Sequence, residues 1–157
     1  MNAATAHSHE MRGVLLPVAS RPLLLPNAAV AEVIGFQVPA AEGRSHPGWL
    51  GFLDWRGRRL PVTSFSGLLG ETDLRGSGRQ RIVVLNALGE SDLDYIGLHA
   101  LASPRLARIT RRQIQPDPEG LPESDLVTAA LRFEGLPAWV PDLDRLEARV
   151  AAMVAGD

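Results

Sequence analysis

The sequence predicts a mainly β fold made of small barrels. Its 157 residues include 15 glycines and 12 prolines, which divide the apolar segments into short runs and favour many short strands over long helices. Short runs separated by frequent turn signals are typical of small barrels rather than of a parallel sheet. The length corresponds to one domain, or to two small halves that share a core.

The first quarter of the chain predicts a tail, two strands and a helical turn. Residues 1–12 have no periodicity and are expected to form a flexible tail. The apolar segment 14–25 is interrupted by turn residues, so we expect two short strands there. Asn27 is a suitable cap for one helical turn that reaches Glu32, followed by a short apolar stretch at 33–36.

The most strongly patterned segment predicts a β-hairpin at 49–62. Two apolar runs flank Arg56-Gly57-Arg58-Arg59, and a glycine in a short connection of this kind is typical of a hairpin turn. Pro61 cannot donate to a sheet ladder, so we expect it at an edge or a bulge. Exposed arginines beside Trp49 and Trp55 are the residue types enriched in protein interfaces. The two tryptophans would equally suit a barrel core.

A short helix and a loop are expected at the middle of the chain. Ser64 is a suitable cap for a helix at 64–69, which Gly70 would end. Residues 71–81 have no hydrophobic pattern and contain Gly76-Ser77-Gly78, so they predict a connecting loop. We expect the boundary between two barrel subdomains near this loop.

The second half predicts three strands, a loop, a second hairpin and a helix. The strands are expected at 82–88, 95–101 and 106–109, and the proline-rich segment 115–125 is expected to be a loop. Apolar runs at 126–133 and 136–140 flank Glu134-Gly135 and predict the hairpin. Asp142 is expected to cap the helix, whose apolar face would consist of Leu143, Leu146, Val150, Met153 and Val154. The chain thus predicts about ten strands and three short helices.

The composition excludes several kinds of chemistry. Without cysteine there is no disulfide, thiolate nucleophile or cysteine zinc site. All 16 basic residues are arginine, which excludes a Schiff-base lysine and a phosphate loop ending in Lys-Ser or Lys-Thr. The chain lacks a Gly-x-Ser-x-Gly nucleophile elbow. Gly76-Ser77-Gly78 leads into a strand, whereas a dinucleotide site needs a helix at that point. We therefore expect no enzyme activity.

The remaining polar residues predict neither a metal site nor a cofactor. The four histidines, none at the spacing of a helical metal site, are His7, His9, His46 and His99. A formal net charge of −2 argues against nucleic acid as a partner. One alternative function is kept, a small anion-binding or ligand-binding β-barrel that uses the arginine strip Arg105, Arg108, Arg111 and Arg112. The simplest interpretation of that strip is a solvated basic surface.

Targeting and membrane signals are missing from the sequence. No apolar run approaches the roughly 20 residues that a spanning helix needs. The first ten residues lack the basic start and apolar core of a signal peptide. We expect a cytoplasmic protein that does not insert into the membrane directly.

A series of short motifs runs through most of the chain. In the first half they are Leu23-Leu24-Leu25-Pro26, Val30-Ala31-Glu32-Val33, Pro47-Gly48-Trp49-Leu50-Gly51, Arg56-Gly57 and Leu60-Pro61-Val62. In the second half they are Ile82-Val83-Val84-Leu85, Ile96-Gly97-Leu98, Gln113-Ile114 and Val140-Pro141-Asp142-Leu143-Asp144-Arg145-Leu146. In this order and spacing the chain resembles the CheW family, the adaptor proteins of bacterial chemosensory arrays. The resemblance covers residues 13–147.

The resemblance implies a fold and a set of partners. The implied fold is two packed five-stranded SH3-like β-barrels with a few short helices, and residues 148–157 would be the end of a C-terminal helix and a tail. The implied role is a scaffold that couples the cytoplasmic tips of chemoreceptors to the regulatory domain of a CheA-like histidine kinase in membrane-associated arrays. The partner-binding residues that it implies are Val30, Glu32, Val33, Gly51, Arg56 and Gly57.

Two departures from the family pattern suggest a particular branch. Ser64 stands where the family often has aspartate, and Ala100-Leu101 stands where it often has Val-Asp. In these respects the chain is similar to the accessory adaptors of type IV pilus chemosensory systems, which implies a role in twitching motility.

Overall fold

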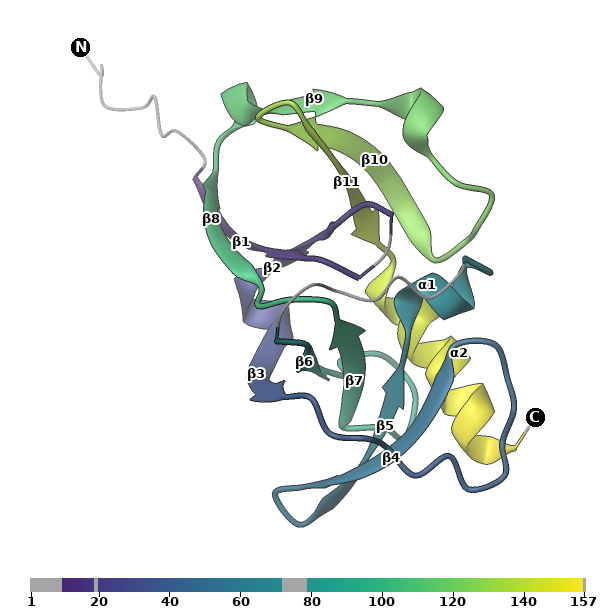
Figure 1. Ribbon diagram of the computed structural model, residues 1–157. Coiled ribbons are helices and arrows are strands. Elements are labelled where there is room, and N and C mark those ends of the chain that lie inside the picture. Colours follow the sequence, from purple (N-terminus) through teal and green to yellow (C-terminus); the bar gives the residue numbers. More distant parts are fainter. Residues whose placement is uncertain (1–9, 19, 72–78, 157) are drawn as a thin grey trace.

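The strands form two sheets that lie one above the other. Figure 1 shows a computed structural model of the protein, which describes residues 10–18, 20–71 and 79–156. The six-stranded sheet is uppermost in that view and the five-stranded sheet is below it. Helix α1 (Phe65–Leu68) lies where the two meet, and helix α2 (Leu143–Ala155) runs alongside the five-stranded sheet. Residues 1–9 of the tail expected at 1–12, and residues 72–78 of the loop expected at 71–81, lie outside the described residues.

The six-stranded sheet contains strands from the N-terminal and the C-terminal parts of the chain. In spatial order its strands are β8 (Arg105–Ile109), β1 (Met11–Leu16), β2 (Leu23–Pro26), β11 (Leu136–Pro141), β10 (Val127–Phe133) and β9 (Ile114–Pro116). All neighbours are antiparallel except β2 and β11, which pair in parallel through Leu23 and Trp139. The short turn η3 (Arg111–Gln113) connects the two edge strands, β8 and β9, so the sheet curls towards a barrel.

The five-stranded sheet is built from the middle of the chain. In spatial order its strands are β3 (Val30–Gly35), β6 (Arg81–Asn86), β7 (Tyr95–Ala100), β5 (Arg58–Thr63) and β4 (Trp49–Trp55). Its two edges approach each other beyond β3, because Ala40 pairs with Phe52 of β4 through two backbone hydrogen bonds of 2.9 Å. The fold predicted from the sequence, mainly β with two small barrels, is confirmed, although one sheet contains six strands because the three-residue β9 is added.

The chain crosses between the two sheets at places other than the expected boundary. It leaves the six-stranded sheet after β2, through the turn η2 (Asn27–Ala29), and returns after β7. The strands that precede and follow residues 71–80 in the sequence, β5 and β6, both pair with β7 and therefore belong to one sheet. The expected subdomain boundary near 71–81 is wrong for this reason, because the order of elements along a chain does not reveal which strands pair.

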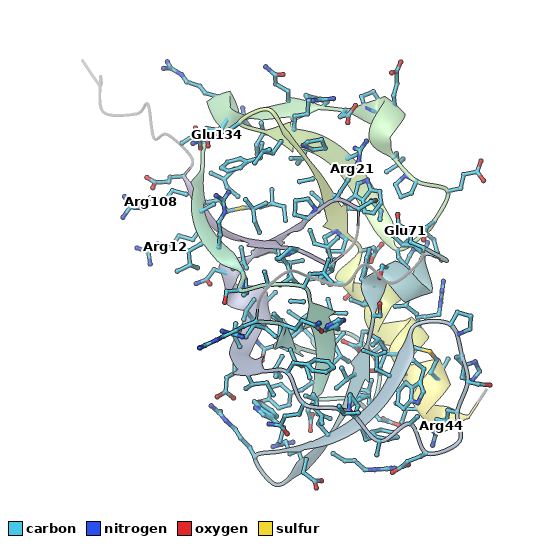
Figure 2. All side chains as sticks on the ribbon, in the orientation of Figure 1. Arg12, Arg21, Arg44, Glu71, Arg108 and Glu134 are labelled. Carbon is cyan, nitrogen blue, oxygen red and sulfur yellow. The ribbon has the colours of Figure 1, made fainter. Side chains whose placement is uncertain are left out.

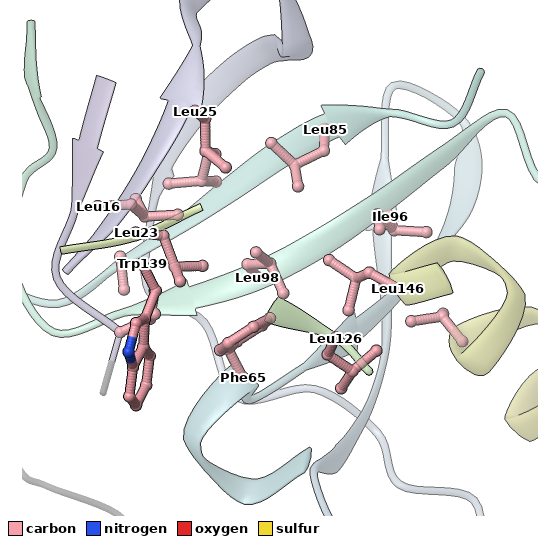
Figure 3. Close-up of a cluster of buried hydrophobic side chains, with 14 of the residues drawn as sticks. Leu16, Leu23, Leu25, Phe65, Leu85, Ile96, Leu98, Leu126, Trp139 and Leu146 are labelled. Atoms are coloured by element: carbon pink, nitrogen blue, oxygen red, sulfur yellow. The ribbon is translucent and has the colours of Figure 1, made fainter. Parts of the chain in front are cut away.

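Alternation along the strands creates three apolar clusters. Leu15 and Leu24 point into the six-stranded barrel, whereas their neighbours Leu16 and Leu23 point to the interface between the barrels. Ile82 and Val84 fill the five-stranded barrel in the same way, while the residues next to them face the interface. Figure 3 shows the shared interface cluster, to which both sheets and both helices contribute Leu16, Leu23, Leu25, Phe65, Leu85, Ile96, Leu98, Leu126, Trp139 and Leu146. Each small barrel thus buries a second apolar layer against the other.

Both predicted helix caps are present. The side chain of Ser64 accepts a hydrogen bond from the backbone N–H of Gly67 at 3.1 Å, and that of Asp142 accepts from Arg145 at 3.1 Å. Helix α2 ends at Gly156 in the left-handed conformation, with φ of 87°. Its buried face contains Leu146, Val150 and Met153, as the spacing predicted.

Some local predictions were wrong. The first strand begins at Met11, inside the expected tail, because β1 pairs with Ile109 there. The helical turn after β2 ends at Ala29, and residues up to Glu32 belong to β3 because they pair with β6. Part of the expected loop at 115–125 is β9, which pairs with β10. Pro61 lies in the inner strand β5, just before the two residues that pair with β7.

Candidate docking surface

The tip of the β4–β5 hairpin is a two-residue turn. Trp55 pairs with Arg58, so Arg56 and Gly57 form the connection. Both have positive φ, 50° for Arg56 and 72° for Gly57, which is the conformation of a type I′ turn. Gly57 has open space around it. This turn projects the Arg56 side chain, which is 65% exposed, from the end of the five-stranded barrel.

The Arg56 and Glu32 side chains, both expected to bind partners, contact each other. The Nε of Arg56 lies 3.3 Å from the Oε2 of Glu32, and the indole Nε1 of Trp55 donates to the same oxygen at 2.6 Å. The Arg56 guanidinium also lies over the Trp55 ring, 5.0 Å from its centroid. Glu32 therefore joins edge strand β3 to the hairpin. Because the ion pair uses the Nε of Arg56, the exposed terminal N–H groups of the guanidinium remain as donors to a partner.

Trp49 and Trp55 are buried side chains. They are 7% and 6% exposed, so of the two interpretations that the sequence left open, the barrel core is the correct one. The Trp55 ring packs edge-on against Tyr95 with centroids 4.8 Å apart, and Trp49 packs in the same way against Phe52 at 4.9 Å. The arginines around them are the exposed component of the hairpin.

Gly51 has a structural position. It is buried at a bulge in β4 with φ of 133°. A Cβ at this position would overlap the carbonyl group of Ala40 and would lie 2.7 Å from the backbone nitrogen of Ala41. Gly51 is thus a point of close approach between the two edges of the five-stranded barrel, where only a residue without a Cβ fits.

The two valines of the Val-x-Glu-Val element differ in their surroundings. Val30 is half-buried and packs against the shared interface cluster. Val33 is 42% exposed, and the apolar exposure continues beyond β3 at Phe36 (39%) and Val38 (85%). Exposed apolar side chains in succession on an edge strand are a common property of protein-binding surfaces. Val33 is therefore the better placed of the two to contact a partner.

A second exposed surface, which the sequence did not suggest, lies beside β8. We call it the β1–β8 cleft, and its lining residues are Arg12, Gly13, Asn27, Leu106, Ala107 and Arg108. Its volume is about 400 Å³. Leu106 is 78% exposed, and Arg12 pairs directly across the strands with Arg108, so Figure 2 shows the two side chains close together. The signal that could have revealed this cleft is Leu106 itself, an apolar residue between the arginines of a short strand.

The four arginines of the expected strip do not converge on one site. Arg105 and Arg108 are three residues apart on β8 and therefore point to opposite faces. Arg108 lines the β1–β8 cleft and lies 3.4 Å from Glu10, whereas Arg105 lines a different cavity. Arg111 and Arg112 belong to η3 and are exposed. An anion site that uses the whole strip is therefore not formed.

Glu147 anchors a loop to α2. This side chain is 3% exposed, and its carboxylate accepts from the backbone N–H of Gly89 at 2.8 Å, from that of Ser91 at 3.2 Å and from the Ser91 hydroxyl. Burial raises the pKa of Glu147, but the hydrogen bonds from the Ser91 side chain and the two backbone N–H groups outweigh burial, so its pKa lies below its ordinary value. The carboxylate holds the loop between β6 and β7 against α2.

The described residues contain neither a metal-binding cluster nor a helix that could span a membrane. Residues 10–18, 20–71 and 79–156 contain no group of three histidine, cysteine or acidic side chains that could hold a metal ion. Within the same residues, neither helix has the length and apolar character required to cross a membrane.

The fold and the two surfaces define a class of protein, a double-barrel module with exposed apolar and arginine side chains suited to binding other proteins. The model of the CheW-like domain family matches residues 12–150 of this sequence, and the chain belongs to that family. The structure is similar to the crystal structure of the scaffolding protein TtCheW from Thermoanaerobacter tengcongensis. The TM-score is 0.74 over 90% of both chains at 19% sequence identity. No curated protein matches the sequence.

Membership of this family indicates a general role for the protein. CheW-like proteins are adaptors, so membership supports a coupling role in chemosensory signalling. Members of the family are non-catalytic scaffolds, which supports a role without enzyme activity.

Proposed function

We propose that this protein is a scaffold that couples chemoreceptor tips to the regulatory domain of a CheA-like histidine kinase. The observation that carries the proposal is the exposure of apolar side chains beside arginines on two strands at the sheet edges, β3 and β8. Exposed apolar area supplies affinity, and the arginines supply directional contacts to carboxylates or backbone carbonyls. Contacts of this kind are individually weak and are multiplied by the repeated geometry of an array.

For the receptor we propose the β1–β8 cleft together with Val33. The cleft contains Leu106 and Asn27, and Asn27 begins the turn that leads directly into β3. An amphipathic helix from a receptor tip would bury its apolar face against Leu106 and Val33. Acidic side chains at the border of that face would pair with Arg12 and Arg108, which face each other across β1 and β8.

Arg56 is proposed as a contact to the partner's polar groups. Its pairing with Glu32 holds the guanidinium on the Trp55 ring, so the side chain loses less conformational entropy on binding than a free arginine would. Glu32 and Gly57 then act by orienting Arg56, while Val30 and Gly51 support the strands beneath. This division of roles among the six expected residues is part of the proposal.

The first test is binding of point variants to a purified receptor tip and kinase regulatory domain from the same genome. Leu106→Asp and Val33→Asp should reduce receptor binding at least tenfold, because each places a charge in the proposed apolar contact. The matched control is Leu88→Asp, since Leu88 is 83% exposed but lies in the loop after β6. Equal binding by all three variants would contradict the receptor surface.

The second test concerns Arg56. Arg56→Glu should weaken binding of receptor or kinase while the circular dichroism spectrum stays unchanged. Arg58→Glu is the matched control, because Arg58 lies on the same hairpin, is 55% exposed and also has an acidic neighbour, Asp94. If the two variants bind alike, Arg56 is not a contact residue.

The proposed setting is a type IV pilus chemosensory system. Ser64 supports it only in part, because serine keeps the helix cap that aspartate would provide and removes its charge. Deletion of the gene in its native host should reduce twitching motility, and expression of the chain should restore it. Loss of flagellar chemotaxis with normal twitching would place the protein in a different system.

A further inference from the structure

The six-stranded barrel has an apolar cavity at one mouth. Its volume is about 330 Å³, and its walls are formed mainly by Leu15, Pro17, Pro22, Phe133, Leu136 and Ala138. Leu136 stands at the rim and is 54% exposed, whereas Phe133 and Ala138 are buried. The volume is at the lower end of the range of about 300–1,000 Å³ that is usual for small-molecule sites, which often occur at barrel mouths.

Small residues contribute to the wall of this cavity. Ala102 and Ala138 line it beside Leu15, whereas the cluster inside the five-stranded barrel contains large side chains such as Trp55 and Leu60. Leu15 pairs with Arg105 across β1 and β8, which brings both residues to this mouth of the barrel.

Arg105 is the unusual residue of this cavity. It alternates in register with Ala107 and Ile109, both of which pack into the barrel cluster, so it lies on the same face of β8 as they do, but at the open mouth of the barrel, where it is exposed. It lines the cavity beside Ser103, and no acidic residue does so. Among the described residues Arg105 has no ion-pair or hydrogen-bond partner. An apolar cavity thus has one unpaired cation and one hydroxyl at its mouth.

We propose that the cavity binds a small amphipathic anion, a straight-chain carboxylate of medium length. The hydrocarbon chain would lie against Leu15, Phe133 and Ala138, which offer it no polar partner. The carboxylate would accept hydrogen bonds from Arg105 and Ser103 at the mouth, where a charge-assisted bond to arginine is favourable. The site is separate from the β1–β8 cleft, because Leu106 and Arg108 point to the opposite face of β8.

Arg105 could instead serve only to protect an edge strand. β8 is an edge of its sheet, and charged side chains on an edge strand are one way in which proteins prevent edge-to-edge association. This role requires no ligand, and under it the cavity would not bind carboxylates more tightly than uncharged molecules. Removal of the charge would then increase self-association without changing the affinity for any small molecule.

The test is a titration of the isolated protein with sodium decanoate, followed by amide chemical shifts in two-dimensional NMR. We expect saturable shifts at Leu15, Arg105, Phe133 and Leu136. Arg105→Gln should weaken decanoate binding about tenfold, because the variant loses the charge-assisted bond, but should change decanol binding less than twofold. The matched control is Arg111→Gln, since Arg111 is exposed on η3 away from the cavity.

A second variant tests the cavity without removing a charge. Ala102→Leu adds apolar volume to a residue that lines the cavity and should reduce the affinity for decanoate and decanol alike. The proposal is overturned if decanoate gives no saturable shifts, if decanoate and decanol lose affinity equally in Arg105→Gln, or if Ala102→Leu binds as the wild type does. None of these measurements involves a receptor or kinase, so the outcome is independent of the proposed coupling role.

Discussion

The two barrels of this protein share an architecture but differ in how they are filled. The five-stranded barrel contains a compact cluster of large side chains, among them Trp55, Leu60 and Ile82, each at most 6% exposed. The six-stranded barrel contains Leu15 and Phe133 beside Gly13, Ala107 and Ala138, and keeps an open apolar cavity. The five-stranded barrel also has a cavity, of about 280 Å³, but charged residues such as Arg58, Asp92 and Asp94 line it beside Trp55 and Leu60. The two barrels therefore differ mainly in the polarity of the residues at their openings.

The largest expected effect comes from removing one aromatic side chain from each barrel. Trp55→Ala should lower the free energy of unfolding by about 5 kcal/mol, and Phe133→Ala by about 3 kcal/mol. The first change removes the larger ring together with its hydrogen bond to Glu32, whereas the second removes a smaller ring beside an apolar cavity that already exists. Urea unfolding followed by far-UV circular dichroism measures both. Equal losses would show that the six-stranded barrel is packed as tightly as the other.

A pair of glycines provides the next comparison. Gly51→Ala should cost about 3 kcal/mol, because its Cβ would overlap the backbone of Ala40 at a positive φ. At Gly13 the added Cβ would meet chiefly the tip of the Ile109 side chain. That tip is the end of a flexible side chain and can shift more easily than backbone, so Gly13→Ala should cost only about 1 kcal/mol. The same unfolding experiment tests both, and a reversed order would contradict the difference in packing.

A smaller effect is expected at Glu147, which attaches a loop of the five-stranded barrel to α2. Glu147→Gln should cost about 2 kcal/mol at neutral pH, because the amide NH2 of the variant would face the N–H and O–H donors of Gly89 and Ser91. The pKa of Glu147 is lower when the protein is folded, so the stabilisation is complete above its ordinary value of 4.5 and disappears as the pH falls through the lower folded pKa.

The pH dependence at Glu147 is checked by urea unfolding of wild type and variant between pH 3 and 7. Glu123→Gln is the control, because Glu123 is exposed and has no hydrogen-bond partner among the described residues. A stability difference that stays constant down to the lowest pH would contradict the assigned role of the carboxylate.

The smallest effect is expected for the pair Glu32 and Arg56. A double-mutant cycle with Glu32→Gln and Arg56→Gln should give a coupling energy of about 0.5 kcal/mol, because the Arg56 side chain is largely exposed. The coupling should shrink further at high salt. A value above about 2 kcal/mol would mean that the ion pair mainly stabilises the five-stranded barrel, which would contradict the role proposed for Glu32 in orienting Arg56.

The correct predictions of local structure rest on residues that are close together in the sequence. Arg56-Gly57 forms the hairpin turn, and Ser64 and Asp142 cap the helices as expected, because each depends on neighbouring residues only. The order of short motifs was sufficient to identify the family. Among the expected site residues, Glu32 and Arg56 are brought together, which their separation in the chain did not suggest.

The incorrect or missing predictions concern contacts between distant residues. The subdomain boundary, the strand character of Glu32 and the role of Pro116 in β9 all depend on which strand pairs with which. Arg105 and Arg108 looked like parts of one basic strip until the register of β8 assigned them to opposite faces. Burial of Glu147 follows from the packing of α2 against a loop 56 residues away, as its contact with Ser91 shows.

The path of the chain has a consequence for synthesis on the ribosome. All strands of the five-stranded barrel have been synthesised once Ala100 is reached, but β2 cannot pair with β11 until synthesis reaches Pro141, where β11 ends. At about 5–20 residues per second, the 41 residues from Leu101 to Pro141 take roughly 2–8 s. During that time the first hairpin has no partner for the β2 edge that later pairs with β11. Newly made chains are thus most vulnerable to misassociation at their N-terminal hairpin, after the middle of the protein is able to fold.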